Sequence, residues 1–180
     1  IFGDPLSGAL FQAPFHSSDS IGVSFDFGIT FEARYHQDVY NTAAGSEAGM
    51  LFVQSSGLYL GEDYGNNFTM QLPDSYSLQM HDTGILPGEL FCLQRPVRNP
   101  LRLGCSWDYG QSFTYSDVLL PGIPYTFDQI DIHRGAVPGE LYFVVWKCPD
   151  TVVLFHSPDY GQHVTEQHLL TDMSYNLYYT

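Results

Sequence analysis

The chain has 180 residues, of which 44% are hydrophobic and 16% aromatic, so it can bury a sizeable core and is neither disordered nor fibrous. It carries six Lys and Arg and 20 Asp and Glu, and the resulting charge of −14 argues against a basic surface for nucleic acid or anionic lipid. No run of 18 apolar residues occurs, so we expect no membrane insertion. The first residues do not form a signal peptide, and any export signal is expected to have been removed or to lie outside the given segment.

An eight-residue pattern occurs four times. Its eight positions hold, in order, a small residue, any residue, Asp, an aromatic residue, Gly, any residue, a mostly small polar residue and an apolar residue. The four copies are residues 24–31, 61–68, 106–113 and 157–164. An Asp side chain can accept hydrogen bonds from nearby backbone N–H groups, and Gly supplies the positive φ of a tight turn. Each copy is therefore predicted to be a turn between two strands.

In chain order, residues 1–20 are predicted to be irregular because Pro, Gly and Ser interrupt short apolar patches. Short strands are predicted around the first copy, and three similar segments precede each later copy. They are residues 21–24 and 31–35; 38–41, 49–53 and 58–60; 77–80, 84–91 and 101–103; and 129–132, 135–142 and 152–155. No helix is predicted, and residues 165–173 are the one segment whose pattern leaves a turn or two of helix open. Residues 174–180 are predicted to open a further strand.

Four short strands per unit, at a period of about 40 to 50 residues, are typical of the blades of a β-propeller. The predicted fold class is therefore all-β, a partial propeller of about three to four blades of four antiparallel strands. The predicted blades are residues 1–35 (partial), 36–72, 73–118 and 119–168, with 169–180 beginning another strand or a tail. Propellers have roughly four to eight blades, so we expect other segments of a longer chain, or another chain, to complete the ring.

The first copy, Ser24-x-Asp26-x-Gly28-x-Thr30-Phe31, resembles the Asp-box or BNR repeat of β-propellers of the sialidase and sortilin type, whose pattern is Ser-x-Asp-x-Gly-x-Thr-Trp. The later copies depart from that pattern at a few positions, and none has the closing Trp. These departures are Gly61, Asn67, Ser112, His163 and Val164. The Pro-Gly-Glu-Leu-aromatic segments resemble, more loosely, secreted Bacteroidetes propellers of the type IX secretion system.

The resemblance implies that the repeated residues are structural, because Asp-boxes lie on outer hairpins away from the active site. The residues concerned are Ser24, Asp26, Gly28, Thr30, Asp63, Gly65, Ser106, Asp108, Gly110, Ser157, Asp159 and Gly161. A functional site is then expected elsewhere, on the inner strands and their loops.

A sialidase site would need three arginines, a nucleophilic Tyr with a Glu partner and an acid Asp. Three of the five arginines, Arg95, Arg98 and Arg102, fall in one predicted hairpin, which does not favour such a triad. A polysaccharide hydrolase needs only two carboxylates, roughly 5 to 9.5 Å apart. The candidates on or near the first strands, which line the channel of a propeller, are Asp82, Asp128 and Asp131. Glu89 and Glu140 occupy equivalent positions in two units, which favours a structural role.

Cys92 and Cys105 flank one predicted hairpin symmetrically, so they are either a cross-strand disulfide or two buried thiols, and Cys148 lies in a predicted turn. No spacing typical of a zinc site occurs. We expect no cofactor, and calcium in the acidic loops is the one cation left open.

Two functions remain from different classes. The first is a secreted or cell-surface module with a binding or structural role, whose partner is a protein or a carbohydrate. The alternative is a fragment of an Asp-box glycoside hydrolase, sialidase-like or polysaccharide-cleaving. The near absence of Lys, with Lys147 alone, and the abundance of Tyr, Phe, Gly and Pro favour a secreted protein.

Overall fold

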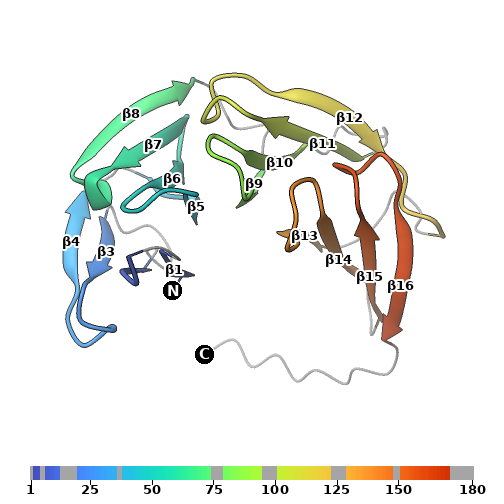
Figure 1. Cartoon of the computed structure of the whole chain (residues 1–180), viewed down its shortest axis with the longest axis horizontal. Helices are drawn as coiled ribbons and strands as arrows, with labels where there is room; N and C mark the ends of the chain where they lie inside the picture. The colour runs from blue at the N-terminus through green and yellow to red at the C-terminus, as the bar shows by residue number, and fades with distance from the viewer. Residues whose placement is uncertain are drawn as a thin grey trace.

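The computed structural model describes residues 2–4, 7–12, 20–35, 38–73, 79–94, 101–122, 129–147 and 151–170. The regular structure of these residues is all strand, apart from a single 3-10 turn, η1 (Asp63–Gly65). The strands form four separate antiparallel sheets of four strands each. Figure 1 shows the sheets as blades side by side around an open arc, which confirms the predicted all-β propeller arrangement.

Within each blade the strands follow chain order from the inside of the arc to the outside (Figure 1). Blade 1 consists of β1 (Phe2–Gly3), β2 (Leu10–Gln12), β3 (Ser20–Ser24) and β4 (Glu32–Tyr35). Blade 2 consists of β5 (Asn41–Ala44), β6 (Leu51–Gln54), β7 (Leu58–Glu62) and β8 (Asn67–Leu72).

Blades 3 and 4 repeat this plan with longer strands. Blade 3 consists of β9 (Gln79–Thr83), β10 (Leu90–Gln94), β11 (Leu101–Ser106) and β12 (Thr114–Val118). Blade 4 consists of β13 (Gln129–Arg134), β14 (Leu141–Lys147), β15 (Thr151–Ser157) and β16 (Thr165–Leu170). The four copies of the sequence pattern join the third and fourth strands of each blade, and we name them turn 1 (residues 24–31), turn 2 (61–68), turn 3 (106–113) and turn 4 (157–164).

The structure corrects one prediction of local structure and resolves a second point that the sequence left open. The first 20 residues are not wholly irregular, because β1 and β2 pair there, with Phe2 opposite Phe11. Phe11 is completely buried against Ile21 and Val23, so packing outweighs the loop-like composition. Residues 165–170 form β16 rather than a helix, since the edge of β15 offers a full ladder of backbone partners. The predicted strand at 174–180 lies outside the described residues.

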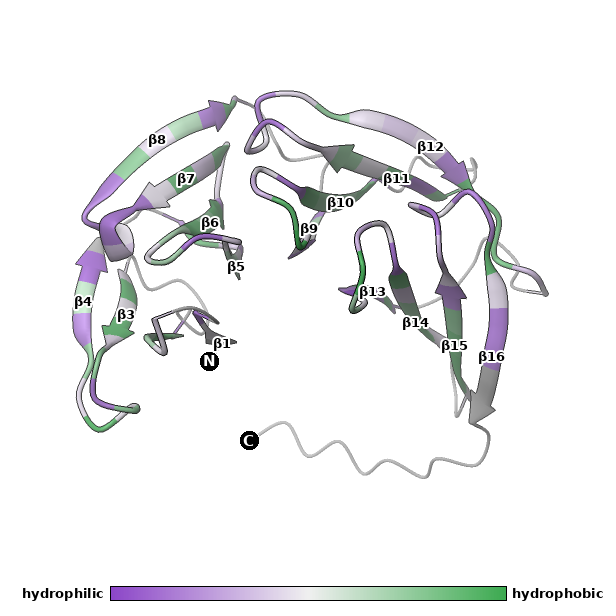
Figure 2. Ribbon diagram, in the orientation of Figure 1, coloured by the Kyte–Doolittle hydropathy of each residue, from purple (hydrophilic) through white to green (hydrophobic). Residues whose placement is uncertain are grey.

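The hydrophobic core lies between blades rather than within them. Three buried clusters each join two neighbouring blades, the largest between blades 3 and 4. All four residues of β6 are buried, which is expected of a strand covered on both faces. Figure 2 shows β10 and β14 as mostly hydrophobic, whereas the outer strands β4, β12 and β16 carry hydrophilic residues.

Candidate functional site

Turn 1 is closed by its own polar side chains. The Ser24 hydroxyl donates to Asp26 Oδ1 at 2.8 Å and accepts from the N–H of Gly28 at 2.8 Å. Asp26 in turn accepts from the Thr30 N–H at Oδ1 (2.9 Å) and from the Thr30 hydroxyl at Oδ2 (2.6 Å). Both oxygens of the carboxylate are thus used within the turn.

Turns 3 and 4 have the same construction. In turn 3, Ser106 donates to Asp108 at 2.8 Å, and Ser112 donates to it through its N–H (2.9 Å) and its hydroxyl (2.6 Å). In turn 4, His163 takes the place of the second hydroxyl, with its N–H 2.8 Å from Asp159 Oδ1 and its ring Nδ1 2.5 Å from Oδ2. The Asp is therefore the centre of the turn whether its partner is Thr, Ser or His.

Turn 2 lacks the serine for a steric reason. A Cβ on Gly61 would lie 2.7 Å from Phe68 Cε1 and 2.8 Å from Leu51 Cδ2, so a serine there would have to displace these side chains. The Asn66 amide instead donates to the backbone oxygen of Asp63 at 2.8 Å. The departure of this copy from the repeat follows from core packing.

Each turn also holds an aromatic residue in the left-handed region. The φ angles of Phe27, Tyr64, Tyr109 and Tyr160 lie between 56° and 60°, a conformation that costs a non-glycine residue roughly 1–2 kcal/mol. In turns 2 to 4, the N–H of this residue donates to the glycine carbonyl of the first hairpin of the same blade, at 2.8 to 3.0 Å. The strained residue thus ties the outer turn to the inner hairpin.

The turn hydrogen bonds hold the carboxylates in the ionised form. The Thr30 hydroxyl and N–H beside Asp26 lower the pKa of that carboxyl to about 2. The pKa of Asp108 is lowered mainly by the Ser112 hydroxyl, and that of Asp159 mainly by the His163 side chain. Such groups accept hydrogen bonds but carry no proton to give at neutral pH.

Replacing Thr30 with valine is expected to raise the pKa of Asp26 towards 3.8, because the largest cause of its lowering is removed. The low folded pKa means that Asp26 stabilises turn 1 above pH 4, and that this contribution is lost as the pH falls from about 4 to about 2. The measurement is an NMR titration of the Asp26 carboxyl carbon, with Asp108 in the same spectrum as the internal control. An unchanged Asp26 midpoint in the variant would contradict this assignment.

Of the three carboxylates predicted for the inner strands, Asp82 is the best defined. Its Oδ2 accepts from the backbone N–H of Arg134 at 3.1 Å, and its Oδ1 accepts from the N–H of Thr83 at 2.8 Å. The guanidinium of Arg134, on blade 4, donates a second hydrogen bond to blade 3, to the carbonyl of Gly84 at 2.6 Å. Asp82 therefore links the inner strands of blades 3 and 4.

Asp131 lies on β13 opposite Val144 of β14 and accepts from the side-chain amide of Gln129 at 3.3 Å. The structure thus places Asp82 and Asp131 on neighbouring inner strands, β9 and β13, which are in contact. Asp128 lies outside the described residues.

Sequence reasoning missed a set of polar side chains that join the inner strands of blades 2 and 3. The amide of Asn41 donates to the carbonyl of Met80, and the side-chain oxygen of Gln54 accepts from the Met80 N–H at 3.0 Å. The hydroxyl of Thr83 donates to the carbonyl of Ala44 at 2.5 Å. Gln54 is the last residue of the otherwise apolar strand β6. A polar residue directly after an apolar run was the one feature of the sequence that could have indicated this buried contact.

Glu89 and Glu140 close the first hairpins of blades 3 and 4. Glu89 Oε2 accepts from the N–H groups of Ile85 and Leu86, at 2.8 and 3.1 Å. Glu140 Oε2 accepts from the Ala136 N–H at 2.6 Å, which is the main cause of its lowered pKa.

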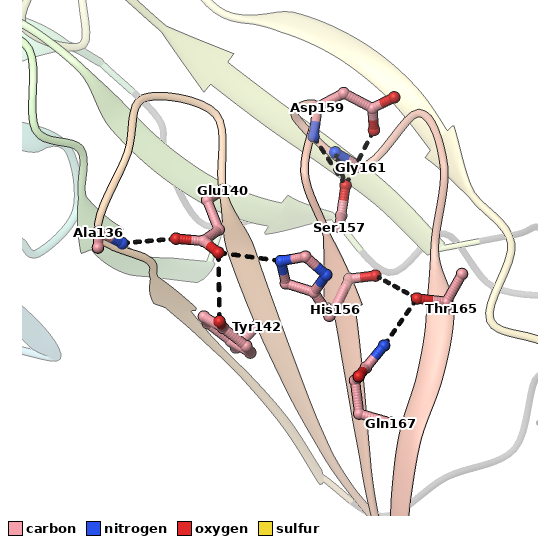
Figure 3. Close-up of polar contacts among 9 residues, drawn as sticks. All are labelled: Ala136, Glu140, Tyr142, His156, Ser157, Asp159, Gly161, Thr165 and Gln167. Atoms are coloured by element: carbon pink, nitrogen blue, oxygen red, sulfur yellow. Dashed lines mark hydrogen bonds and ion pairs between the residues drawn. The ribbon is translucent and has the colours of Figure 1, made fainter.

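The second oxygen of Glu140 has two further partners within blade 4. Oε1 lies 3.2 Å from the hydroxyl of Tyr142 and 3.1 Å from Nε2 of His156 (Figure 3). These two side chains stand on neighbouring strands, directly opposite one another. The carboxylate is thus fully engaged by its own blade.

Of the two alternatives for Cys92 and Cys105, the structure has two buried thiols, because both residues are free. The hairpin register pairs Cys92 with Gly104 and Phe91 with Cys105, one residue away from the expected pairing. A slip of one residue turns a side chain to the opposite face of the sheet, so the two sulfurs do not face each other. Burial raises the pKa of both thiols to about 12, which leaves them unreactive. Cys148 lies outside the described residues.

Within the described part of the chain, no group of three or more His, Cys, Asp and Glu residues is placed to hold a metal ion. The same residues include no helix long and apolar enough to cross a membrane.

No protein-family model matches the sequence, and no curated protein matches it either. Solved structures do match the fold. One is the GH74 xyloglucanase from Xanthomonas campestris, with a TM-score of 0.55 at 15% sequence identity. The match covers 88% of this chain but only 28% of the xyloglucanase, so the chain corresponds in extent to a minor part of that protein. At this identity the likeness concerns the propeller fold.

Proposed function

We propose that this chain is four consecutive blades of an Asp-box β-propeller of the sialidase and sortilin type, acting as a non-catalytic module in binding or assembly. The observation that carries this proposal is the use of the carboxylates. Asp26, Asp108 and Asp159 accept hydrogen bonds inside their turns. Asp82 accepts a hydrogen bond from the backbone N–H of Arg134 in the next blade. Carboxylates held in this way stabilise a scaffold.

The module is proposed to act outside the cell or at its surface, with a protein or carbohydrate partner. A single lysine, a charge of −14 and 13 Tyr with 13 Phe support this location, as does the loose resemblance to type IX secreted propellers. The acidic surface disfavours nucleic acid as the partner. Further blades, from other segments or another chain, are proposed to complete the ring.

A glycoside hydrolase fragment is the second candidate. Asp82 and Asp131 on neighbouring inner strands favour it, since glycoside hydrolysis uses two carboxylates. The hydrogen bonds of Asp82 to the backbone N–H groups of Arg134 and Thr83 count against it, because both oxygens of this carboxylate already have partners within the protein.

The test is a panel of soluble polysaccharides that includes xyloglucan, with two readouts on the full chain. Native electrophoresis in polysaccharide-containing gels measures binding as retarded migration, and a reducing-sugar assay measures cleavage. We expect no release of reducing sugar, from the wild type or from Asp131→Asn. Release by the wild type that Asp131→Asn abolishes, with the circular dichroism spectrum unchanged, would establish the hydrolase instead.

A further inference from the structure

The outer strand of blade 2, β8, differs from the other outer strands that the structure describes in having no charged residue. Its sequence is Asn-Phe-Thr-Met-Gln-Leu, whereas β4 carries Glu32 and Arg34, β12 carries Asp117 and β16 carries Glu166. As the last strand of its sheet, β8 has an edge that pairs with no described strand (Figure 1). Charged side chains commonly keep such an edge from pairing with another chain. The edge of β8 lacks this protection, and its Met70 is 54% exposed.

The same strand begins with a tripeptide of the form Asn-x-Ser/Thr, the acceptor sequence for N-linked glycans. The tripeptide is Asn67-Phe68-Thr69. Asn67 and Thr69 are both exposed, whereas Phe68 packs against the cluster that joins blades 1 and 2. Because alternate residues of a strand point to opposite faces, the amide of Asn67 and the hydroxyl of Thr69 share the solvent-facing side of β8.

The side chain of Asn67 is also not needed to close turn 2. It is the seventh residue of its turn, and the equivalent residues of turns 1, 3 and 4 each bind the Asp of the turn through their side chains. In turn 2 the preceding residue, Asn66, contacts Asp63 instead. Asn67 forms no side-chain hydrogen bond with any residue that the structure describes. A group attached to its amide would therefore cost the described fold no contact.

We propose that Asn67 is the acceptor of an N-linked glycan, and that this bulky hydrophilic group protects the uncharged edge of β8. The donor is an oligosaccharide carried on a polyprenyl pyrophosphate. A bond forms between Asn67 Nδ2 and C1 of the first sugar, the bond from C1 to the pyrophosphate oxygen breaks, and the amide releases one proton. The lipid pyrophosphate is the leaving group. This inference rests on the proposed function in one respect, the location outside the cell, since such acceptor sites belong to secreted proteins.

The experiment expresses the 180-residue chain behind a cleavable export signal in yeast and measures the intact mass of the purified protein. No other Asn-x-Ser/Thr tripeptide occurs in the sequence, so any N-linked mass reports on this site. We expect a mass above 20.3 kDa that peptide-N-glycosidase returns to that of the chain. Asn67→Gln and Thr69→Ala should each lose the whole difference. Thr69→Ser and the matched control Asn66→Gln preserve the acceptor sequence and should retain it.

The site is then examined in the protein isolated from its natural source. Cleavage after Glu62 and Glu89 releases residues 63–89, which contain both Asn66 and Asn67. We expect peptide-N-glycosidase to release a glycan and to convert Asn67, but not Asn66, to Asp. An unmodified Asn67 in the secreted recombinant chain or in the natural protein would overturn the proposal.

Removal of the glycan from the folded protein tests its role at the edge. Light scattering over time is expected to show faster association of the deglycosylated chain than of the glycosylated chain. Met70→Lys places a charge on β8 and should abolish this increase. Equal rates with and without the glycan, or an increase that Met70→Lys does not reduce, would overturn the protective role. The polysaccharide assays are run on both forms, so the proposed function stands or fails separately.

Discussion

Replacing Phe143 with alanine is expected to lower the free energy of unfolding by about 3–5 kcal/mol, the usual cost of removing a buried phenylalanine side chain. Phe143 is completely buried in the cluster that joins blades 3 and 4. Its loss leaves a cavity between two sheets that cannot close without moving a blade. Urea denaturation followed by circular dichroism gives this free energy.

The neighbouring Tyr142 provides the control, because its side chain lies on the opposite face of β14 and is only half-buried. Tyr142→Ala removes one hydrogen bond, to Glu140, and half-buried ring surface. We expect Tyr142→Ala to lower the free energy of unfolding by about 1–2 kcal/mol. Equal losses at the two positions would contradict the assignment of one covered and one exposed face.

Gly110→Ala is expected to destabilise the chain by about 2–5 kcal/mol, the sum of two effects. The residue has φ +85°, and alanine in the left-handed region costs roughly 1–2 kcal/mol. Its Cβ would also lie 2.4 Å from Leu58 Cδ2 of blade 2, and such overpacking costs about 1–3 kcal/mol more. Glycine at this position lets turn 3 approach the preceding blade.

Gly122 isolates the two effects, since it has φ +70° but no heavy atom within 4 Å of the Cβ position. Gly122→Ala should show the backbone cost alone, about 1–2 kcal/mol. Thermal unfolding of both variants beside the wild type makes the comparison. A Gly110→Ala variant no less stable than Gly122→Ala would contradict the close packing of turn 3 against Leu58 of blade 2.

The recurrence of one short pattern was enough to predict the fold, because each copy specifies a turn between the same two strands of a blade. Residues 1–12 could not be predicted in this way. Their strands are two and three residues long and depend on the burial of Phe11 against blade 2, a contact distant in sequence.

The sequence predicted that Asp82 and Asp131 lie on or near inner strands, as they do on β9 and β13, but it did not predict their contacts. The sequence places Asp82 on an inner strand, yet its bond to the Arg134 N–H joins residues 52 positions apart. The sequence also left open whether Cys92 and Cys105 form a disulfide, since that depends on a hairpin symmetric about them, and a shift of one residue reverses the faces. Both cases depend on register, which the residue pattern alone does not determine.

The central claim is that the carboxylates of this chain serve its scaffold, and the unfolding free energy of Asp82→Ala tests it most directly. We expect a loss of about 1–3 kcal/mol, because the N–H of Arg134 loses its partner between blades 3 and 4. Asp117→Ala, which removes an exposed carboxylate 3.6 Å from Arg102, should cost at most about 1 kcal/mol. Catalytic residues are commonly held at a cost to stability. An Asp82→Ala variant as stable as the wild type, or more stable, would therefore contradict the scaffold role and favour a catalytic one.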